Sequence, residues 1–338
     1  MAEVRQKDFI DSEFQSGKKR PRKTIGEEGP RKQTLIGLIA TILLGLMFYL
    51  PTEFKKWWRE WNQPEVIRIE KPIGDQKELS EAVGFKVEIK QKTDVVTAME
   101  KILGNLNGDY GVYVKSLTGN EELKINENKI MTAASVIKLP VLALYYQAVD
   151  EGKLDQEEVY SLLEKDRWVY GTGSMQGQPA GTKYSYKQIA YLVANQSDNM
   201  GAEVLIKKLG GYSAAQKKVG ALGLEKTDLN KNETTTAEAG KLLEEIAKKK
   251  LLTDASRAEL FKNLTNTVLE DRIPAGVPSG IEVQHKFGSE TGVVNDCGIV
   301  RAKKPYVICV MSTGINDGEA QVVLPKISRV IWEWLGDN

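Results

Sequence analysis

The chain has 338 residues, of which 41% are hydrophobic and 28% are charged, and its formal net charge is +1. This composition fits one sizeable globular domain with additional segments, or two small domains, and the near-neutral charge gives no general attraction to nucleic acid. A single histidine, His285, and two cysteines, Cys297 and Cys309, leave almost nothing for a transition-metal site, so we expect neither a metal nor another cofactor.

The chain begins with a polar segment that is followed by an apolar one. Residues 1–33 carry more Lys and Arg than Asp and Glu and show no apolar periodicity, which predicts a disordered basic tail. Residues 34–50 contain no charged side chain. As a helix they would extend roughly 26 Å, close to the thickness of a bilayer core. We therefore predict a transmembrane anchor there, in preference to a cleaved signal peptide or a buried core helix.

The flanks of the apolar segment predict its orientation. Trp57, Trp58 and Trp61 follow it as an interfacial aromatic belt would, and Pro51 leads on without the small-residue pattern of a signal-peptide cleavage site. The basic tail places the N-terminus in the cytoplasm by the positive-inside rule. We therefore predict a single-pass membrane protein, with residues 51–94 as juxtamembrane segment and linker and the rest outside the cytoplasm.

Small residues recur at four-residue spacing within the predicted anchor, at Gly37, Thr41 and Gly45. Such a stripe lets two helices approach closely, which would give a weak homodimer. The alternative is that the small residues are simply tolerated in the span.

Residues 95–338 predict an α+β domain. A helical pattern and a strand come first, a long and mostly helical stretch follows, and three strands and a helix close the chain. The corresponding ranges are 94–103, 110–116, 134–262, 281–287, 296–302, 305–313 and 320–335. We therefore predict an antiparallel sheet with flanking terminal helices and an inserted all-helical lobe, and an active site in the cleft between them.

The two cysteines fall in neighbouring predicted strands. That placement allows a disulfide between Cys297 and Cys309. Two small buried thiols are the alternative that the sequence favours.

Ser135 precedes Lys138 by one helical turn, at the head of the apolar run "VIKLPVLALYY". A serine hydroxyl needs a base to attack at neutral pH, and a lysine at i+3 lies on the same helical face. The amine is a poor base at its usual pKa of about 10.4, but burial or a second cation would lower that pKa. The helix N-terminus also offers free N–H groups to an oxyanion. We therefore predict Ser135 as nucleophile and Lys138 as its base.

Two later motifs supply what this pair lacks. In "NQSDNMG", Ser197 can relay a proton to a leaving nitrogen, while Asn199 can position Lys138 and a substrate carbonyl. In "VQHKFGSETG", Lys286 can attract a substrate carboxylate, and Gly288 has no side chain to keep a substrate from the strand edge. The alternatives are a helix cap for the first motif and a solubilising edge-strand charge for Lys286.

Together these motifs resemble those of the class A β-lactamase-like serine hydrolases, relatives of penicillin-binding proteins. Ser135–Lys138 matches Ser-x-x-Lys, residues 197–199 match Ser-Asp-Asn, and residues 286–288 stand where Lys-Thr-Gly is expected. The resemblance covers roughly residues 95–337, and it implies the β-lactamase/transpeptidase-like fold.

The resemblance also implies roles for individual residues. Ser135 would be acylated, Lys138 would be the acylation base and Ser197 the proton relay. Asn199 and Lys286 would bind substrate, the N–H groups of Ser135 and Ser289 would hold the oxyanion, and Tyr170 or Trp168 would form an aromatic wall at the cleft mouth.

Two departures from the family pattern bear on activity. Lys226 stands where these β-lactamases carry the loop glutamate that activates the deacylating water, and Glu225 and Asp228 are out of register and are read as surface charges. Loss of such a base costs about 10²–10⁴-fold in rate. Phe287 replaces the threonine whose hydroxyl would donate to a substrate carboxylate. His285 should point to the opposite face of the strand and is read as structural.

The sequence therefore predicts a membrane-anchored, extracytoplasmic serine hydrolase. It would be acylated at Ser135 by a β-lactam or a cell-wall peptide amide, and it would deacylate slowly. One alternative is a D,D-peptidase-like enzyme. The other is a non-catalytic envelope-binding protein, which Phe287 and the altered loop favour and which the intact Ser135, Lys138, Ser197 and Asn199 oppose.

Overall fold

The computed structural model describes residues 91–104, 106–166 and 171–336. Within these ranges no helix has both the length and the apolar character that crossing a membrane requires. The predicted tail at 1–33, the predicted anchor at 34–50 with its small-residue stripe, and most of the predicted linker at 51–94 lie outside the described residues.

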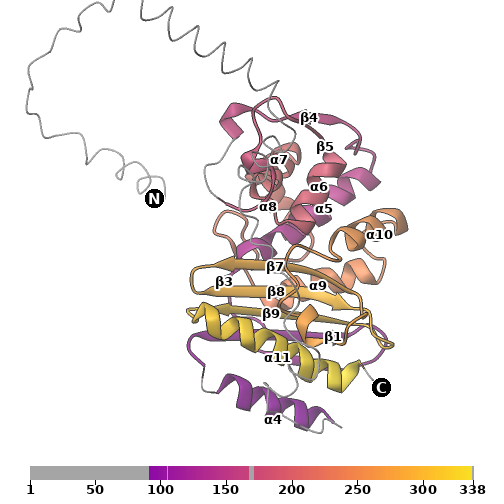
Figure 1. Ribbon diagram of the computed structural model, residues 1–338. Coiled ribbons are helices and arrows are strands. Elements are labelled where there is room, and N and C mark those ends of the chain that lie inside the picture. The colour runs from indigo at the N-terminus through magenta and orange to yellow at the C-terminus, as the bar shows by residue number, and fades with distance from the viewer. Residues whose placement is uncertain (1–90, 105, 167–170, 337–338) are drawn as a thin grey trace, which may run out of the picture. The chain divides into compact units, whose positions relative to one another are not determined.

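The described part of the chain is an α+β domain built on a five-stranded antiparallel sheet with the strand order β2-β1-β9-β8-β7 (Figure 1). The sheet strands are β1 (Asp109–Ser116), β2 (Glu122–Ile125), β7 (Val283–Glu290), β8 (Val293–Val300) and β9 (Tyr306–Thr313). The strands β8 and β9 are buried along nearly their whole length, and β7 is buried over its first six residues even though it carries polar side chains. In this order β7 lies at one edge of the sheet.

The two terminal helices cover one face of the sheet. They are α4 (Lys92–Leu103) and α11 (Asp317–Leu335), which pack against each other and enclose an apolar core with the strands. A capping box at Gln91 and Asp94 begins α4, and the side chain of Asn316 caps α11. The prediction of an antiparallel sheet with flanking terminal helices is confirmed.

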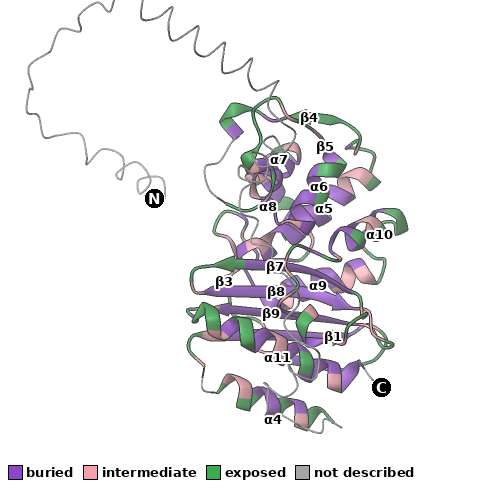
Figure 2. Ribbon diagram, in the orientation of Figure 1, coloured by how far each residue is buried: buried purple, intermediate pink, exposed green. Residues whose placement is uncertain are grey.

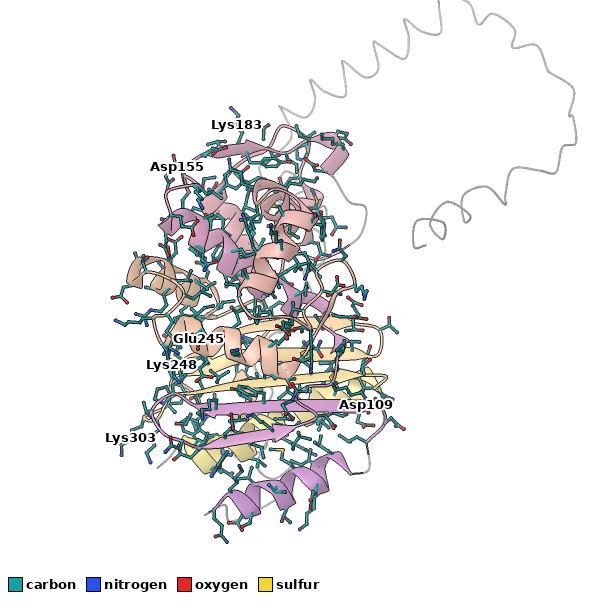
Figure 3. The ribbon with its side chains drawn as sticks, turned by 180° about the vertical axis from the view of Figure 1, so that it is seen from behind. Asp109, Asp155, Lys183, Glu245, Lys248 and Lys303 are labelled. Atoms are coloured by element: carbon teal, nitrogen blue, oxygen red, sulfur yellow. A yellow bond between two sulfur atoms is a disulfide. The ribbon has the colours of Figure 1, made fainter. Side chains whose placement is uncertain are left out.

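The second lobe is inserted between β3 and β7. It contains α5 (Lys138–Asp150), α6 (Tyr186–Asn195), α7 (Asn199–Lys208), α8 (Tyr212–Ala221) and α10 (Asp254–Asn263). Its buried side chains form a core that is continuous with the other face of the sheet, and Figure 2 shows buried residues running through α5 and α6. Charged side chains such as Asp155 and Lys183 in this lobe, and Asp109 and Lys303 at the sheet, are labelled in Figure 3.

The prediction of an all-helical insertion is wrong in two places. A small hairpin of β4 (Val159–Ser161) and β5 (Lys183–Ser185) lies within the lobe. It was not predicted because strands of three residues are too short to show a period-two pattern. The helix α9 (Thr236–Ala247) packs on β1 and β9, so it covers the sheet and is not part of the helical lobe. A second short pair, β3 (Met131–Thr132) and β6 (Glu233–Thr234), joins the segment before Ser135 to a loop that follows α8.

The favoured reading of two free thiols is also wrong. Cys297 and Cys309 form a disulfide. They are directly opposed partners on β8 and β9, with their Cα atoms 4.0 Å apart, and the antiparallel register therefore brings the two sulfurs together. The sequence alone did not fix this register.

Candidate active site

Ser135 lies on a short 3₁₀ helix, Ala134–Ile137, that leads directly into α5 at Lys138. A 3₁₀ turn has three residues, so the side chains at i and i+3 are aligned. Lys138 Nζ accordingly lies 2.8 Å from Ser135 Oγ. Ala134, just before the serine, has a positive φ of 46°, a conformation that is unusual for a residue with a side chain. The local backbone therefore presents the serine and the lysine to each other.

Lys138 is buried and is surrounded by acceptors. Its Nζ donates to Ser197 O at 2.7 Å and to Asn199 Oδ1 at 2.5 Å, and it lies 3.2 Å from Ser197 Oγ. Burial lowers the pKa of Lys138 to about 7, although the charges of Asp198 and Glu290 oppose the change. A neutral amine there can donate its two protons to Ser197 O and Asn199 Oδ1, which leaves its lone pair for the proton of Ser135.

Ser197 and its two neighbours lie at the junction of α6 and α7, as predicted. Ser197 has a left-handed φ of 59°, and its carbonyl also accepts a hydrogen bond from Thr172 Oγ1 at 2.8 Å. The fully buried Asp198 caps α7 through Gly201 N and also accepts from Met175 N, both at 2.8 Å. The alternative of a helix cap is thus correct for Asp198, while Ser197 and Asn199 contact Lys138.

Gly288 brings the edge strand against the nucleophile. A Cβ added at Gly288 would lie 2.7 Å from the amide nitrogen of Ser135 and 3.0 Å from that of Val136. Only a glycine permits this approach. The predicted reason for this glycine, room for a substrate, is therefore incomplete, because the backbone of the serine segment already occupies the space.

The free edge of β7 faces the same segment. His285 N donates to Leu264 O on the side away from β8. Amide groups alternate sides along a strand, so Ser289 N, four residues on, points to that same free edge. This alternation puts Ser289 N on the edge of β7 that faces the serine segment, and a shared oxyanion site with Ser135 N stays a prediction.

Lys286 is completely buried, which rules out the alternative of a solubilising surface charge. Its Nζ donates to Phe287 O at 2.9 Å and lies 4.0 Å from the centre of the Phe287 ring. Burial, and then the neighbouring Lys138, hold the pKa of Lys286 well below its ordinary value. Lys138 therefore disfavours the charged form of Lys286, while the lowered pKa of Lys138 itself is due to burial and not to a second cation.

Arg272 contacts this cluster, although the sequence did not single it out. The buried guanidinium donates from Nη1 to Gly288 O at 2.8 Å and to Asn295 O at 2.7 Å, and from Nη2 to Ser289 Oγ at 2.5 Å. Because Ser289 Oγ accepts this bond, its own proton is free to be donated outward. Arg272 is separated from β7 by a turn of η4 (Pro274–Gly276), and no short sequence motif signals the contact.

His285 is structural, as predicted. It is fully buried on the side of β7 opposite to Lys286, with Nδ1 2.8 Å from Asp296 Oδ1 and Nε2 3.1 Å from Glu270 Oε1. These two carboxylates outweigh burial and raise the pKa of His285 to about 9. The resulting imidazolium ties β7 to β8 and to the turn that carries Arg272.

The loop that carries Lys226 has its acidic side chains at the surface or bonded within the loop. Lys226 is exposed, and its Nζ donates to Asn128 O at 3.2 Å. Asp228 turns back on its own loop and accepts from Asn230 N at 2.9 Å, while Glu225 is exposed. These positions match the reading of both carboxylates as surface charges.

Most of the predicted site residues thus meet in one place: Ser135, Lys138, Ser197, Asn199, Lys286, Gly288 and Ser289. Tyr170 and Trp168, the candidates for the aromatic wall, lie outside the described residues. Besides Arg272, the sequence reasoning missed Thr172, whose hydroxyl holds the Ser197 carbonyl from a glycine-rich loop. In the described part of the chain, no three His, Cys, Asp or Glu side chains are grouped so that they could hold a metal ion.

Comparison with known proteins agrees with this geometry. Residues 94–335 match the family described as "Beta-lactamase enzyme family". The chain is 22% identical to β-lactamase VEB-1 of Pseudomonas aeruginosa over 272 residues, covering 72% of this chain and 91% of that protein. Among solved structures it is similar to PBP-A, at 25% identity and a TM-score of 0.68, covering 73% of this chain and 98% of PBP-A. A PBP-A variant solved as an acyl-enzyme complex with penicillin G superposes with a TM-score of 0.67 and covers the same shares.

Proposed function

The chain belongs to the beta-lactamase enzyme family, and on that premise we propose that it is an active-site serine hydrolase acylated at Ser135 by a β-lactam or a cell-wall peptide amide. The observation that carries the proposal is the position of Lys138 Nζ, 2.8 Å from Ser135 Oγ and bonded to both Ser197 and Asn199. A protein that only binds a ligand has no need for a buried lysine of lowered pKa held beside a serine.

Acylation follows from this geometry. The neutral Lys138 amine takes the proton of Ser135, and Ser135 Oγ attacks the amide carbonyl carbon. The N–H groups of Ser135 and Ser289 stabilise the oxyanion. The proton then passes through Ser197 Oγ, 3.2 Å from Lys138 Nζ, to the nitrogen that leaves as the C–N bond breaks. The product is an ester on Ser135.

The residues of β7 favour a substrate that carries a carboxylate beside the scissile amide. The Arg272 guanidinium lies there and turns the proton of Ser289 outward, and a bound carboxylate would favour the protonated form of Lys286, whose pKa burial otherwise lowers. Phe287 supplies no hydroxyl, so this subsite has one donor fewer than the family pattern provides. We expect carboxylate recognition by Ser289 and a preference for acyl donors with more apolar surface.

Slow release of the acyl group is the second part of the proposal. The loop has Lys226 in place of the glutamate, Asp228 accepts a hydrogen bond within the loop, and Glu225 is exposed. The likeness to PBP-A, of which a variant is solved as a penicillin acyl-enzyme, supports an enzyme that acylates readily. A D,D-peptidase-like activity fits the same acylating residues. A non-catalytic envelope-binding protein is favoured only by Phe287 and the altered loop.

We also propose that residues 34–50 anchor the protein in a bacterial cell membrane, with the domain outside the cytoplasm. The uncharged segment and its basic and aromatic flanks support this placement. Protease added to intact cells should digest the domain and leave a protected N-terminal fragment. Protection of the domain in intact cells would contradict the orientation.

The deciding experiment is intact-mass spectrometry of the full-length protein mixed with benzylpenicillin. A mass increase equal to the drug, absent from Ser135→Ala with the same circular-dichroism spectrum, is the expected result. Labelling that survives in Ser135→Ala would remove Ser135 as nucleophile. If neither the drug nor a D-Ala-D-Ala peptide ester gives an adduct on the wild-type protein, the non-catalytic envelope-binding protein is the remaining hypothesis.

A further inference from the structure

A carboxylate that the family pattern does not use lies near the catalytic lysine. The negative charges of two described residues, Asp198 and Glu290, raise the pKa of Lys138 against the effect of burial. Both oxygens of Asp198 are engaged by backbone N–H groups within a fully buried site. Glu290 is exposed at the end of β7, and so it is the one of the two that solvent can reach.

The strand places Glu290 on the nucleophile's side of β7. Side chains alternate along a strand, so residues 286, 288 and 290 share one face. Gly288 presents that face to the amide of Ser135, and Lys286 on the same face is close enough to influence Lys138. Glu290 therefore starts about 7 Å further along the strand from Gly288. Its charge also acts on Lys138, whose Nζ lies 2.8 Å from Ser135 Oγ, so the carboxylate belongs to the surroundings of the nucleophile.

Asn232 holds this carboxylate in place. Its Nδ2 donates to Glu290 Oε1 at 2.6 Å, and its carbonyl accepts from Ala133 N at 2.7 Å, two residues before the nucleophile. Among the described residues this is the only hydrogen bond that Glu290 accepts, which leaves its second oxygen available. Asn232 thus connects the serine segment, the short loop and the end of β7.

The conformation of Asn232 is costly. Its φ is 56°, in the left-handed region, and its Oδ1 is buried without a hydrogen-bond partner in the described part of the chain. Each of these features disfavours the folded state. A side chain held in this way, with its one donor group on a carboxylate, indicates that the position of that carboxylate matters.

We propose that Glu290, positioned by Asn232, activates the water that hydrolyses the acyl group on Ser135. The inference rests on the proposed function and assigns its slow second step to a residue. The water attacks the ester carbonyl carbon and gives one proton to Glu290. As the bond from that carbon to Ser135 Oγ breaks, Glu290 gives this proton through a bridging water to Ser135 Oγ, and the other hydrogen of the attacking water leaves with the released acid. Glu290 is then a carboxylate and Ser135 a hydroxyl again, so the protein ends in its starting state.

The test measures acylation and deacylation separately in the full-length protein, using benzylpenicillin and intact-mass spectrometry. Glu290→Gln keeps an oxygen that can accept from Asn232, and it should slow loss of the adduct by about 10²-fold, the lower end of general-base catalysis. Asn232→Gly tolerates the left-handed backbone and removes the donor, so it should slow deacylation as well. Glu225 is an exposed carboxylate on the loop that carries Asn232. Glu225→Gln is therefore the matched control, and it should change neither rate.

The outcomes separate this inference from the proposed function. A wild-type adduct that is lost at the same rate in Glu290→Gln and Asn232→Gly overturns the role of Glu290 and leaves the acylating serine intact. A wild-type adduct that never decays overturns it also. Slower acylation by a peptide ester with a free amine, together with unchanged deacylation, would show that Glu290 recognises substrate instead. Absence of any wild-type adduct would overturn the proposed function and this inference with it.

Discussion

Gly288 lies so close to Ser135 that a single methyl group between them would come within 2.7 Å of the serine's amide nitrogen. We expect Gly288→Ala to displace the serine segment or the end of β7. The cost is about 1–3 kcal/mol in the free energy of unfolding, as for other overpacked sites. Acylation should slow as well, because the oxyanion N–H of Ser135 moves. Thermal unfolding and the rate of adduct formation measure the two effects.

The matched control for that variant is Gly177→Ala, because a Cβ at Gly177 meets nothing within 4 Å. It should leave both the melting temperature and the acylation rate unchanged. Equal behaviour of the two alanine variants would show that the contact between Gly288 and Ser135 has no functional weight.

The lowered pKa of Lys138 predicts the pH dependence of acylation. The neutral amine is the base, so the acylation rate should rise as the pH passes through about 7 and then level off. Lys138→Ala should slow acylation by at least about 10²-fold and abolish that rise. Stopped-flow mixing with a chromogenic cephalosporin checks both. A rate that keeps rising toward pH 10 would mean that the lysine titrates at its ordinary pKa.

The His285 imidazolium predicts a loss of stability at alkaline pH. Its folded-state pKa of about 9 lies above the ordinary value of 6.5, so its contribution is complete below pH 6.5 and is lost as the pH rises through about 9. Lys138 and Lys286 have lowered pKa values and act in the opposite sense over this range. The informative quantity is therefore the difference in melting temperature between wild type and His285→Gln, which should shrink from pH 6 to pH 9.5. A constant difference would mean that the imidazole is neutral.

The disulfide between Cys297 and Cys309 should stabilise the sheet without taking part in catalysis. Replacing both residues with alanine should lower the free energy of unfolding by about 2–4 kcal/mol. Urea denaturation measures this loss, and benzylpenicillin labelling of Ser135 should persist in the variant. Alkylation of two thiols in the denatured but unreduced wild-type protein would contradict the assignment.

Much of the sheet and the two terminal helices could be predicted from the sequence, because long apolar strands and an amphipathic C-terminal helix carry strong periodic signals. The hairpin of β4 and β5 could not, since each strand has three residues. The disulfide depended on the register of β8 against β9. That register follows from the whole sheet and not from either strand alone.

The contacts among Ser135, Lys138 and Ser197 were predictable because these residues lie in short contiguous motifs whose chemistry is specific. Arg272 and Glu290 were missed for the opposite reason. Each reaches the site from a separate turn or strand end, and each looks like an ordinary surface charge in the sequence. The role of Asn232 depends on its two hydrogen bonds, which join the serine segment to β7 and are visible only in the structure.

Three side-chain-bearing residues around the nucleophile, Ala134, Ser197 and Asn232, have backbones in the left-handed region. Each such residue costs about 1–3 kcal/mol, and glycine at any of the three would relieve part of that cost. Stabilising substitutions are therefore expected at these three positions, next to the proposed nucleophile. Variants selected only for a higher melting temperature would tend to lose the acylating geometry, and libraries for such work should leave these three positions fixed.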